Sequence, residues 1–260
     1  MIQVTEKHYL PGVLQPQHVH ATTGVSLVLA GAVRERVGRA DEVGRALSVV
    51  VKPAGTEHAN EFGPAGAHML QVLLDEPAGT ELLALERRLA TWRWEHAGRA
   101  VPPFLRLLGL ARRPGSGDAV ERATFDVLAA LVEPADSGAD SGADSGARGG
   151  APRWLRVVRE KLDDAGADTP RVRELAASAG VHPVYLARQF RRYVGCSVTE
   201  YAQRLRLQRA AARAAAGAGR PLAATACEAG FFDHAHLCRT FRRATGVTPS
   251  AYRSLVGAAR

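Results

Sequence analysis

Two stretches, LARQFRRYVGCSVTEY at residues 186–201 and LCRTFRRATGVTPSAY at residues 237–252, decide the fold of the C-terminal part of this chain. Seven of their 16 aligned positions are identical. Upstream of them, LAASAG (175–180) aligns with TACEAG (225–230). Each copy reads as a short helix, a glycine turn, a second helix and a glycine stop, which is the pattern of a helix-turn-helix unit. The repeat predicts an all-α domain with two such units.

The second helix of each copy has one apolar face and one basic face. Leu186 and Phe190 are four residues apart, as are Leu237 and Phe241, and both pairs are expected to face the core. Residues 199–216 between the copies contain strong helix formers, so we expect a rigid helix that separates the two units. The arginines off the apolar face are expected to reach DNA: Arg188, Arg191, Arg192, Arg239, Arg242 and Arg243.

The charge of the chain divides in the same place as its repeat pattern. Residues 151–260 carry 19 Lys and Arg against 8 Asp and Glu, a net charge of +11, whereas residues 1–150 carry a net charge of −3. This asymmetry is typical of a nucleic-acid-binding module beside a neutral or acidic domain. The three cysteines form no CxxC pair, no apolar run reaches about 18 residues, and no signal peptide is apparent. A cytoplasmic protein with no membrane partner is therefore expected.

A linker is predicted between the two parts of the chain. The stretch PADSGADSGADSGARGGAP at residues 134–152 repeats ADSG three times and has no apolar side chain larger than alanine. Such a segment cannot bury enough apolar surface to offset its ordering entropy. The predicted organisation is a β-barrel at 1–76, a helical region at 77–133 that could support dimerisation, the linker at 134–152, and the DNA-binding domain at 153–260.

The first 133 residues combine two patterns. Short β-rich runs at 25–29, 33–37, 47–51 and 68–74, separated by turn residues, predict a small β-barrel or sandwich. From residue 79 to 132 the apolar spacing becomes helical, and Pro102-Pro103 is expected to divide this region into at least two helices. The helical spacing is carried by Leu82, Leu83, Leu85, Leu89 and Trp92.

Helix boundaries in the C-terminal part are marked by proline and glycine. Thr169-Pro170, His182-Pro183 and Thr248-Pro249 are expected to begin helices. Glycines are expected to end the preceding helices in the left-handed conformation: Gly180, Gly195, Gly230 and Gly246.

The stretch GFFDHAHLCRTFRRATGVTPSAYR at residues 230–253 resembles the second helix-turn-helix signature of the AraC/XylS family of transcription regulators. The resemblance covers roughly 105 residues, from about residue 154 to the end. The chain departs from the family pattern at Thr225, where isoleucine is usual, and at Val198, where proline is common. Both departures are expected to soften helix packing rather than to change function.

The resemblance implies which side chains read base edges. In the first unit these are Val184, Ala187 and Arg188. Arg188 and its counterpart Arg239 are the best candidates for direct readout, because arginine can donate two hydrogen bonds to guanine; phosphate contact or a salt bridge is the alternative. The remaining arginines are expected to contact phosphates. In the second unit the implied positions are His234, Ala235, Cys238 and Arg239.

The N-terminal segment carries His18-Val-His20, Gly31 and PAGTEHAN at residues 53–60, which together resemble the two motifs of a cupin barrel. The glutamate of that metal site would fall near Gly24, and no carboxylate lies between His20 and Glu35. His18, His20 and His58 could still hold a metal ion with an open position. The alternative is that these histidines line an effector pocket or pair with backbone groups, and no cofactor is expected.

The sequence thus favours a transcription regulator, not an enzyme, that binds double-stranded DNA and is controlled by a small-molecule effector in the barrel. The resemblance also allows contact with RNA polymerase and a homodimer. The alternative is a metal-dependent cupin enzyme fused to a DNA-binding module. A nucleoid protein that binds DNA without sequence preference is disfavoured, because such a protein does not need two paired reading helices.

Overall fold

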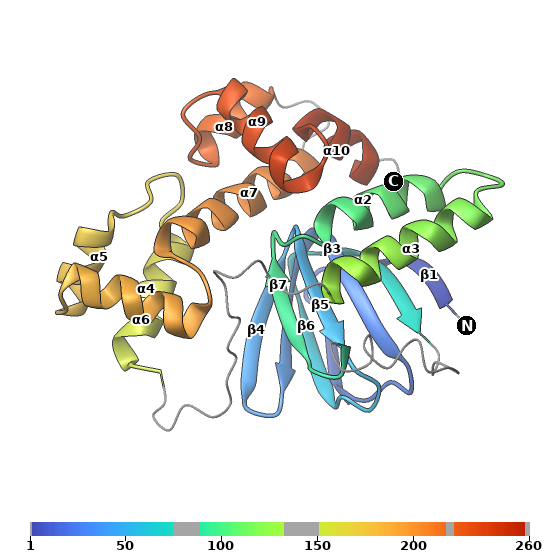
Figure 1. The fold of residues 1–260 in the computed structure, drawn as a ribbon, viewed down its shortest axis with the longest axis horizontal. Helices are drawn as coiled ribbons and strands as arrows, with labels where there is room; N and C mark the ends of the chain where they lie inside the picture. The colour runs from blue at the N-terminus through green and yellow to red at the C-terminus, as the bar shows by residue number, and fades with distance from the viewer. Residues whose placement is uncertain (1, 75–88, 133–150, 217–220, 258–260) are drawn as a thin grey trace.

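The computed structural model describes residues 2–74, 89–132, 151–216 and 221–257 (Figure 1). Leu82, Leu83 and Leu85, on which part of the predicted helical region rests, lie outside the described residues. So do residues 134–150, nearly all of the linker predicted at 134–152. The chain has an N-terminal β-sheet region, as the β-rich runs predict, and a helical C-terminal region, as the repeat predicts. No helix in the described part is long and apolar enough to cross a membrane.

The N-terminal region is one antiparallel sheet in the order β1-β6-β3-β5-β7, with β2 paired to β6 and β4 paired to β3. Val25, Leu27 and Leu70 point into the main core on one face, whereas Val28 and Phe62 belong to a smaller cluster. The strands are β1 (Ile2–Tyr9), β2 (Leu14–His18), β3 (Thr23–Val37), β4 (Ala40–Arg45), β5 (Ser48–Lys52), β6 (His58–Leu74) and β7 (Arg93–His96).

The predicted strands at 25–29 and 33–37 form one long strand, β3, with irregular register against β6. Gly31 does not end a strand but bends it. Its φ is +75°, and a Cβ added there would lie 2.0 Å from the carbonyl oxygen of Gly66. Glycine is therefore required at this close approach of two backbones.

Part of the region expected to be helical is a strand. β7 pairs with β5 through Ser48 opposite His96, and the Trp94 ring fills the space that a side chain at Gly44 would need. The sheet thus extends beyond the predicted limit at residue 76. Two helices follow the strand. Pro102 and Pro103, predicted to divide two helices, lie instead in the first turn of the first of these and begin it. These helices are α2 (Val101–Ala111) and α3 (Gly117–Val132).

Seven helices make up the described C-terminal region. The predicted starts at Pro183 and Pro249 are confirmed, and all four predicted glycines have positive φ. The start predicted at Thr169-Pro170 is wrong: the helix begins at Val172, where the Glu174 carboxylate accepts the backbone N–H of Arg171. The helices are α4 (Arg153–Asp164), α5 (Val172–Ala179), α6 (Pro183–Val194), α7 (Val198–Ala216), α8 (Leu222–Glu228), α9 (His234–Thr245) and α10 (Pro249–Gly257).

The two helix pairs differ in what they pack against. The first pair, α5 and α6, has a core of its own with α4 and the start of α7. The second pair, α8 and α9, shares one continuous core with α7, α10, the sheet, α2 and α3. In Figure 1 the first pair lies apart from the sheet, while α7 leads across its end to the second pair beside α2. The apolar core of the second pair thus continues into the N-terminal region, whereas that of the first pair does not.

Candidate nucleic-acid interface

The helices α6 and α9 bury equivalent residues. Leu186 and Phe190 of α6 are fully buried, and so are Leu237 and Phe241 of α9. Both helices are thus held from one side, by α5 and by α8 respectively, and present the opposite side outward. The predicted apolar faces are confirmed at all four positions.

The outward sides of α6 and α9 carry the same five helical positions, which we call the outer stripes. Every member is exposed apart from Cys238, which is half-buried. Residue intervals of three and four place each set along one face of its helix. The stripe on α6 consists of Val184, Ala187, Arg188, Arg191 and Arg192, and that on α9 of Ala235, Cys238, Arg239, Arg242 and Arg243.

The first turn of each helix is capped by a side chain. The Nδ1 atom of His182 accepts the backbone N–H of Val184 at 3.3 Å, and the Oδ1 atom of Asp233 accepts that of His236 at 2.6 Å. Aspartate is a favoured N-cap residue because its carboxylate satisfies an otherwise unpaired N–H. His234, predicted to contact bases, is exposed beside this cap, and its Nε2 atom lies 3.4 Å from the Sγ atom of Cys238.

Four arginines of the outer stripes are available for a partner outside the chain. Within the described ranges, the side chains of Arg188, Arg239, Arg242 and Arg243 make no hydrogen bond or ion pair. Arg192 lies over the ring of Tyr193, with its guanidinium carbon 5.7 Å from the ring centroid. A guanidinium without an internal partner can offer its fork of N–H donors to phosphate or guanine.

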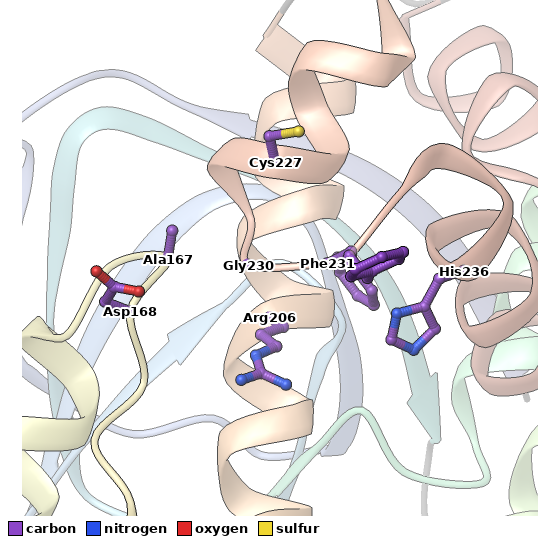
Figure 2. A pocket seen from close by; sticks show the side chains of 8 residues that line it. Ala167, Asp168, Arg206, Cys227, Gly230, Phe231 and His236 are labelled. Carbon is purple, nitrogen blue, oxygen red and sulfur yellow. The ribbon is translucent and has the colours of Figure 1, made fainter.

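A cleft of about 440 Å³ lies between the two helix pairs (Figure 2). Its walls come from the loop before α5, from Arg206 of α7 and from the turn between α8 and α9. Gly230 has a φ of +85°, and a Cβ there would lie 2.7 Å from the carbonyl oxygen of Ala167, so glycine lets the two units approach. Phe232 in that turn is 90% exposed, a surface position that the repeat alignment did not single out.

Polar contacts also connect α7 and α4 to the sheet. The Nε2 atom of Gln208 donates to the Oγ atom of Ser48 at 2.9 Å, and that hydroxyl lies 2.8 Å from Nδ1 of His96. Arg159 of α4 makes an ion pair of 3.1 Å with Glu42 of β4. The sheet is thus in direct polar contact with the helix that separates the two helix pairs.

The three histidines singled out in the sequence come together at the ends of β2 and β6. Ring centroids are 4.2 Å apart for His18 and His58, 4.9 Å for His18 and His20, and 5.2 Å for His20 and His58. One ring nitrogen of each histidine lies within 4.8 Å of one ring nitrogen of each of the others. The Nδ1 atom of His18 contacts the carbonyl oxygen of Pro16 at 2.7 Å, and that of His58 contacts the carbonyl of Thr56 at 2.9 Å.

These contacts set the chemistry of the histidine cluster. With Nδ1 engaged on a backbone carbonyl, Nε2 is left as an acceptor, the arrangement common in metal-binding histidines. The Nε2 atom of His58 is buried and has no partner among the described residues. Burial and the nearby Lys52 lower the pKa of His58 to about 4, so its imidazole is neutral at neutral pH. The cluster can hold a metal ion or accept a hydrogen bond from a bound small molecule.

The sequence motif missed one member of this region, Glu35. The motif places a carboxylate near Gly24, but the sheet brings Glu35 of β3 opposite Asn60 of β6, two residues from His58. Glu35 is buried, pairs with Lys52 and accepts a hydrogen bond of 2.7 Å from Nε1 of Trp92. Only the pairing of β3 with β6 reveals this neighbour.

Comparison with known proteins identifies a domain in the C-terminal region. Residues 175–254 match a family model described as a helix-turn-helix domain. The match spans both helix pairs but less than half of the chain. No curated protein sequence matches the chain significantly.

Several solved structures have similar parts. The C-terminal domain of AraT, a response regulator from Geobacillus stearothermophilus, is 23% identical with a TM-score of 0.37, over 40% of this chain and 87% of that one. The DNA-binding domain of AdpA, solved with a target DNA, is 25% identical with a TM-score of 0.38, over 41% and 95%.

The N-terminal region has a partial likeness to an oxalate decarboxylase of Bacillus subtilis, 18% identical with a TM-score of 0.27, over 31% of this chain and 22% of that one. With TM-scores this low, no argument rests on any of these structural likenesses. The sequence match of residues 175–254 nevertheless agrees with the resemblance read from the repeat. The C-terminal region of this chain carries a helix-turn-helix domain of the AraC type.

Proposed function

We propose that this protein is a sequence-specific DNA-binding transcription regulator that reads two sites on one duplex. In this proposal α5 with α6 and α8 with α9 are the two helix-turn-helix units, and α6 and α9 are the reading helices. The outer stripes face the major groove. Arg188 and Arg239 read bases, while Arg242 and Arg243 hold phosphates.

One observation carries this proposal. The same five positions are turned outward on two helices whose opposite faces are fully buried, and four arginines among them have no partner in the described residues. Partner-free cations on a segment with a net charge of +11 favour a polyanion. Repetition at 51-residue spacing favours a ligand that repeats as well, and successive major grooves of DNA do so.

The helix α7 sets the spacing between the units. Its 19 residues extend about 28 Å at 1.5 Å per residue. Successive major grooves on one face of a duplex are about 34 Å apart. A helix of this length, with the two pairs at its ends, supports engagement of neighbouring grooves rather than of one groove twice.

We infer that the sheet region controls DNA binding through a small-molecule effector bound near His18, His20 and His58. The buried Nε2 atom of His58, without a partner in the described part of the chain, supports a ligand there. A cupin-type barrel remains part of this proposal. The same three imidazoles suit a metal ion with an open position, which is the basis of the alternative, a metal-dependent enzyme tethered to DNA. Contact with RNA polymerase and a homodimer stay predictions.

The test uses the full-length protein and a bound sequence selected from a random duplex library. We expect the salt dependence of log Kd to be steep, with a slope of about 0.9 per phosphate contacted. On a panel of single-base variants of the selected site, Arg188→Ala and Arg239→Ala should each cost on the order of 1–3 kcal/mol and relax preference at one base pair. The two affected positions should lie about 10 base pairs apart.

Two control variants complete the design. Arg243→Ala should weaken binding to all sequences alike and lower the salt slope by about one. Arg122→Ala removes the same charge from an exposed position on α3 and should leave both affinity and preference unchanged. Recovery of no preferred sequence, or uniform loss in Arg188→Ala and Arg239→Ala, would contradict base reading by these residues.

A further inference from the structure

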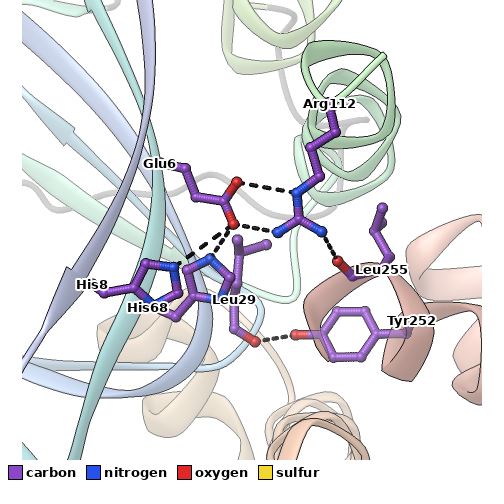
Figure 3. Close-up of polar contacts among 7 residues, drawn as sticks. All are labelled: Glu6, His8, Leu29, His68, Arg112, Tyr252 and Leu255. Atoms are coloured by element: carbon purple, nitrogen blue, oxygen red, sulfur yellow. Dashed lines mark hydrogen bonds and ion pairs between the residues drawn. The ribbon is translucent and has the colours of Figure 1, made fainter. Parts of the chain in front are cut away.

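A second group of metal-ligating side chains lies on β1 and β6, away from the three histidines. Glu6 and His8 are two residues apart on β1 and so share one face of the strand. His68 of β6 lies directly opposite His8 in the register. The alternation of the two strands therefore puts one carboxylate and two imidazoles on the same face of the sheet, next to α2 and α10 (Figure 3).

We propose that Glu6, His8 and His68 form a site for a divalent transition-metal ion such as Zn²⁺, located where the sheet region meets the DNA-binding domain. The ligand atoms would be Oε1 of Glu6 and one ring nitrogen of each histidine. A fourth position would remain open for water or for a small ligand. Two imidazoles and one carboxylate are a common ligand set for zinc with an open position.

The distances suit such an ion. The Nε2 atom of His68 lies 2.5 Å from Oε1 of Glu6, and that of His8 lies 4.0 Å from the same oxygen. The ligand atoms all lie within 4.8 Å of one another. Bonds of about 2.0–2.1 Å in tetrahedral geometry place ligand atoms about 3.3 Å apart, between these two values. Binding therefore needs side-chain adjustments of about an ångström and no movement of the strands.

The two histidines differ in burial in a way that favours ligation. His68 is 7% exposed, whereas the side chain of His8 is 54% exposed and can turn toward the ion from solvent. The rings are stacked, with centroids 4.0 Å apart, so the exposed His8 ring must tilt for its nitrogen and that of His68 to bind one ion. Burial holds the pKa of His68 below its ordinary value, although the hydrogen bond with Glu6 opposes this.

The guanidinium of Arg112 already contacts the carboxylate of Glu6. The Nε atom of Arg112, the residue after α2, donates to Oε2 of Glu6 at 3.1 Å, and its Nη2 atom contacts Oε1. Burial raises the pKa of Glu6, but the hydrogen bonds from Arg112 and His68 outweigh it and hold the pKa below its ordinary value. The site is thus built for an ionised Glu6 with positive charge beside it.

The same arginine reaches the DNA-binding domain. The Nη1 atom of Arg112 donates to the carbonyl oxygen of Leu255 in α10 (Figure 3). A metal ion on Oε1 takes the oxygen that Nη2 uses and repels the guanidinium. Metal binding therefore competes with the contact between Arg112 and Glu6. It would weaken the bridge that Arg112 makes between Glu6 of β1 and Leu255 of α10. This consequence rests on the proposed function, whereas the metal site itself does not.

The test is equilibrium dialysis of the full-length protein, without an affinity tag, against Zn²⁺, with Co²⁺ as a spectroscopic probe. Because His18, His20 and His58 could bind a second ion, the variant His18→Ala/His20→Ala is the background in which the new site is measured. We expect that background to retain one equivalent of Zn²⁺ and to give the intense visible absorption of four-coordinate Co²⁺. Adding His8→Ala should remove both signals while circular dichroism stays unchanged, since His8 is exposed.

Competition with Arg112 has its own readout. Arg112→Gln removes a positive charge beside the ion and frees Oε1, so it should tighten Zn²⁺ binding by about tenfold or more. Retention of the metal in the His8→Ala background variant, or no metal in the His18→Ala/His20→Ala variant, overturns the site. Weaker binding in Arg112→Gln overturns the competition. None of these results depends on DNA binding, so failure of the metal site and failure of the proposed function are distinguishable.

Discussion

Replacement of Tyr252 by phenylalanine tests how firmly α10, the helix that follows the second helix pair, is tied to the sheet. The Tyr252 side chain is fully buried, and its hydroxyl donates to the carbonyl oxygen of Leu29 in β3 (Figure 3). Leu29 lies at a register shift between β3 and β6, where the ladder skips a residue. The hydroxyl thus donates to a carbonyl oxygen where the register between β3 and β6 shifts. This hydrogen bond connects positions 223 residues apart.

The expected magnitude follows from what the substitution removes. Phenylalanine keeps the ring and its edge contact with Phe241, whose centroid lies 5.4 Å away, so no cavity forms. The loss is one buried hydrogen bond with an acceptor left unpaired, which costs about 1–3 kcal/mol. The unfolding constant should rise roughly 5- to 150-fold, since about 1.4 kcal/mol is a factor of ten.

Urea denaturation of the full-length protein measures this cost. With a slope of about 3 kcal/mol/M, the midpoint should fall by about 0.3–1 M. Tyr185→Phe is the matched control, because Tyr185 is 42% exposed and such a change at the surface should stay within about 0.5 kcal/mol. If Tyr252→Phe unfolds at the same midpoint as Tyr185→Phe, the hydroxyl does not stabilise the junction and the reasoning is refuted.

Two further predictions concern the sheet. The pKa of His58 is lowered to about 4, so the unfolded chain binds a proton there at higher pH than the folded one does. The free energy of unfolding should therefore fall as pH drops from about 6.5 toward about 4, and His58→Gln should flatten this dependence in urea titrations; an unchanged slope in the variant would show that other groups cause it. Gly31→Ala should destabilise the protein by at least about 2 kcal/mol more than Gly115→Ala, by thermal or urea unfolding. Both glycines have a φ near +75°, but only at Gly31 would the added Cβ meet backbone, so equal costs would refute the steric argument.

The sequence by itself determined the features that depend on local periodicity. Leu186 and Phe190 repeat as Leu237 and Phe241 because a helix returns to the same face after four residues, and this placed the buried faces and the outer stripes correctly. The glycine stops were predictable because only glycine adopts positive φ readily. The start of α5 was misplaced, because Glu174 supplies a cap that Thr169-Pro170 does not.

Contacts between residues far apart in the sequence could be identified only from the tertiary structure. β7 was read as helix because four residues that pair with β5 carry no periodicity long enough to recognise. Glu35 reaches the histidines through strand pairing, and Glu6 meets His68 and Arg112 from positions 62 and 106 residues away. Strand register and helix docking follow from the whole core packing at once, whereas helix faces and caps follow from neighbours in the chain. For that reason the sequence alone predicted the helices proposed to read DNA, and the fold alone showed how the rest of the molecule holds them.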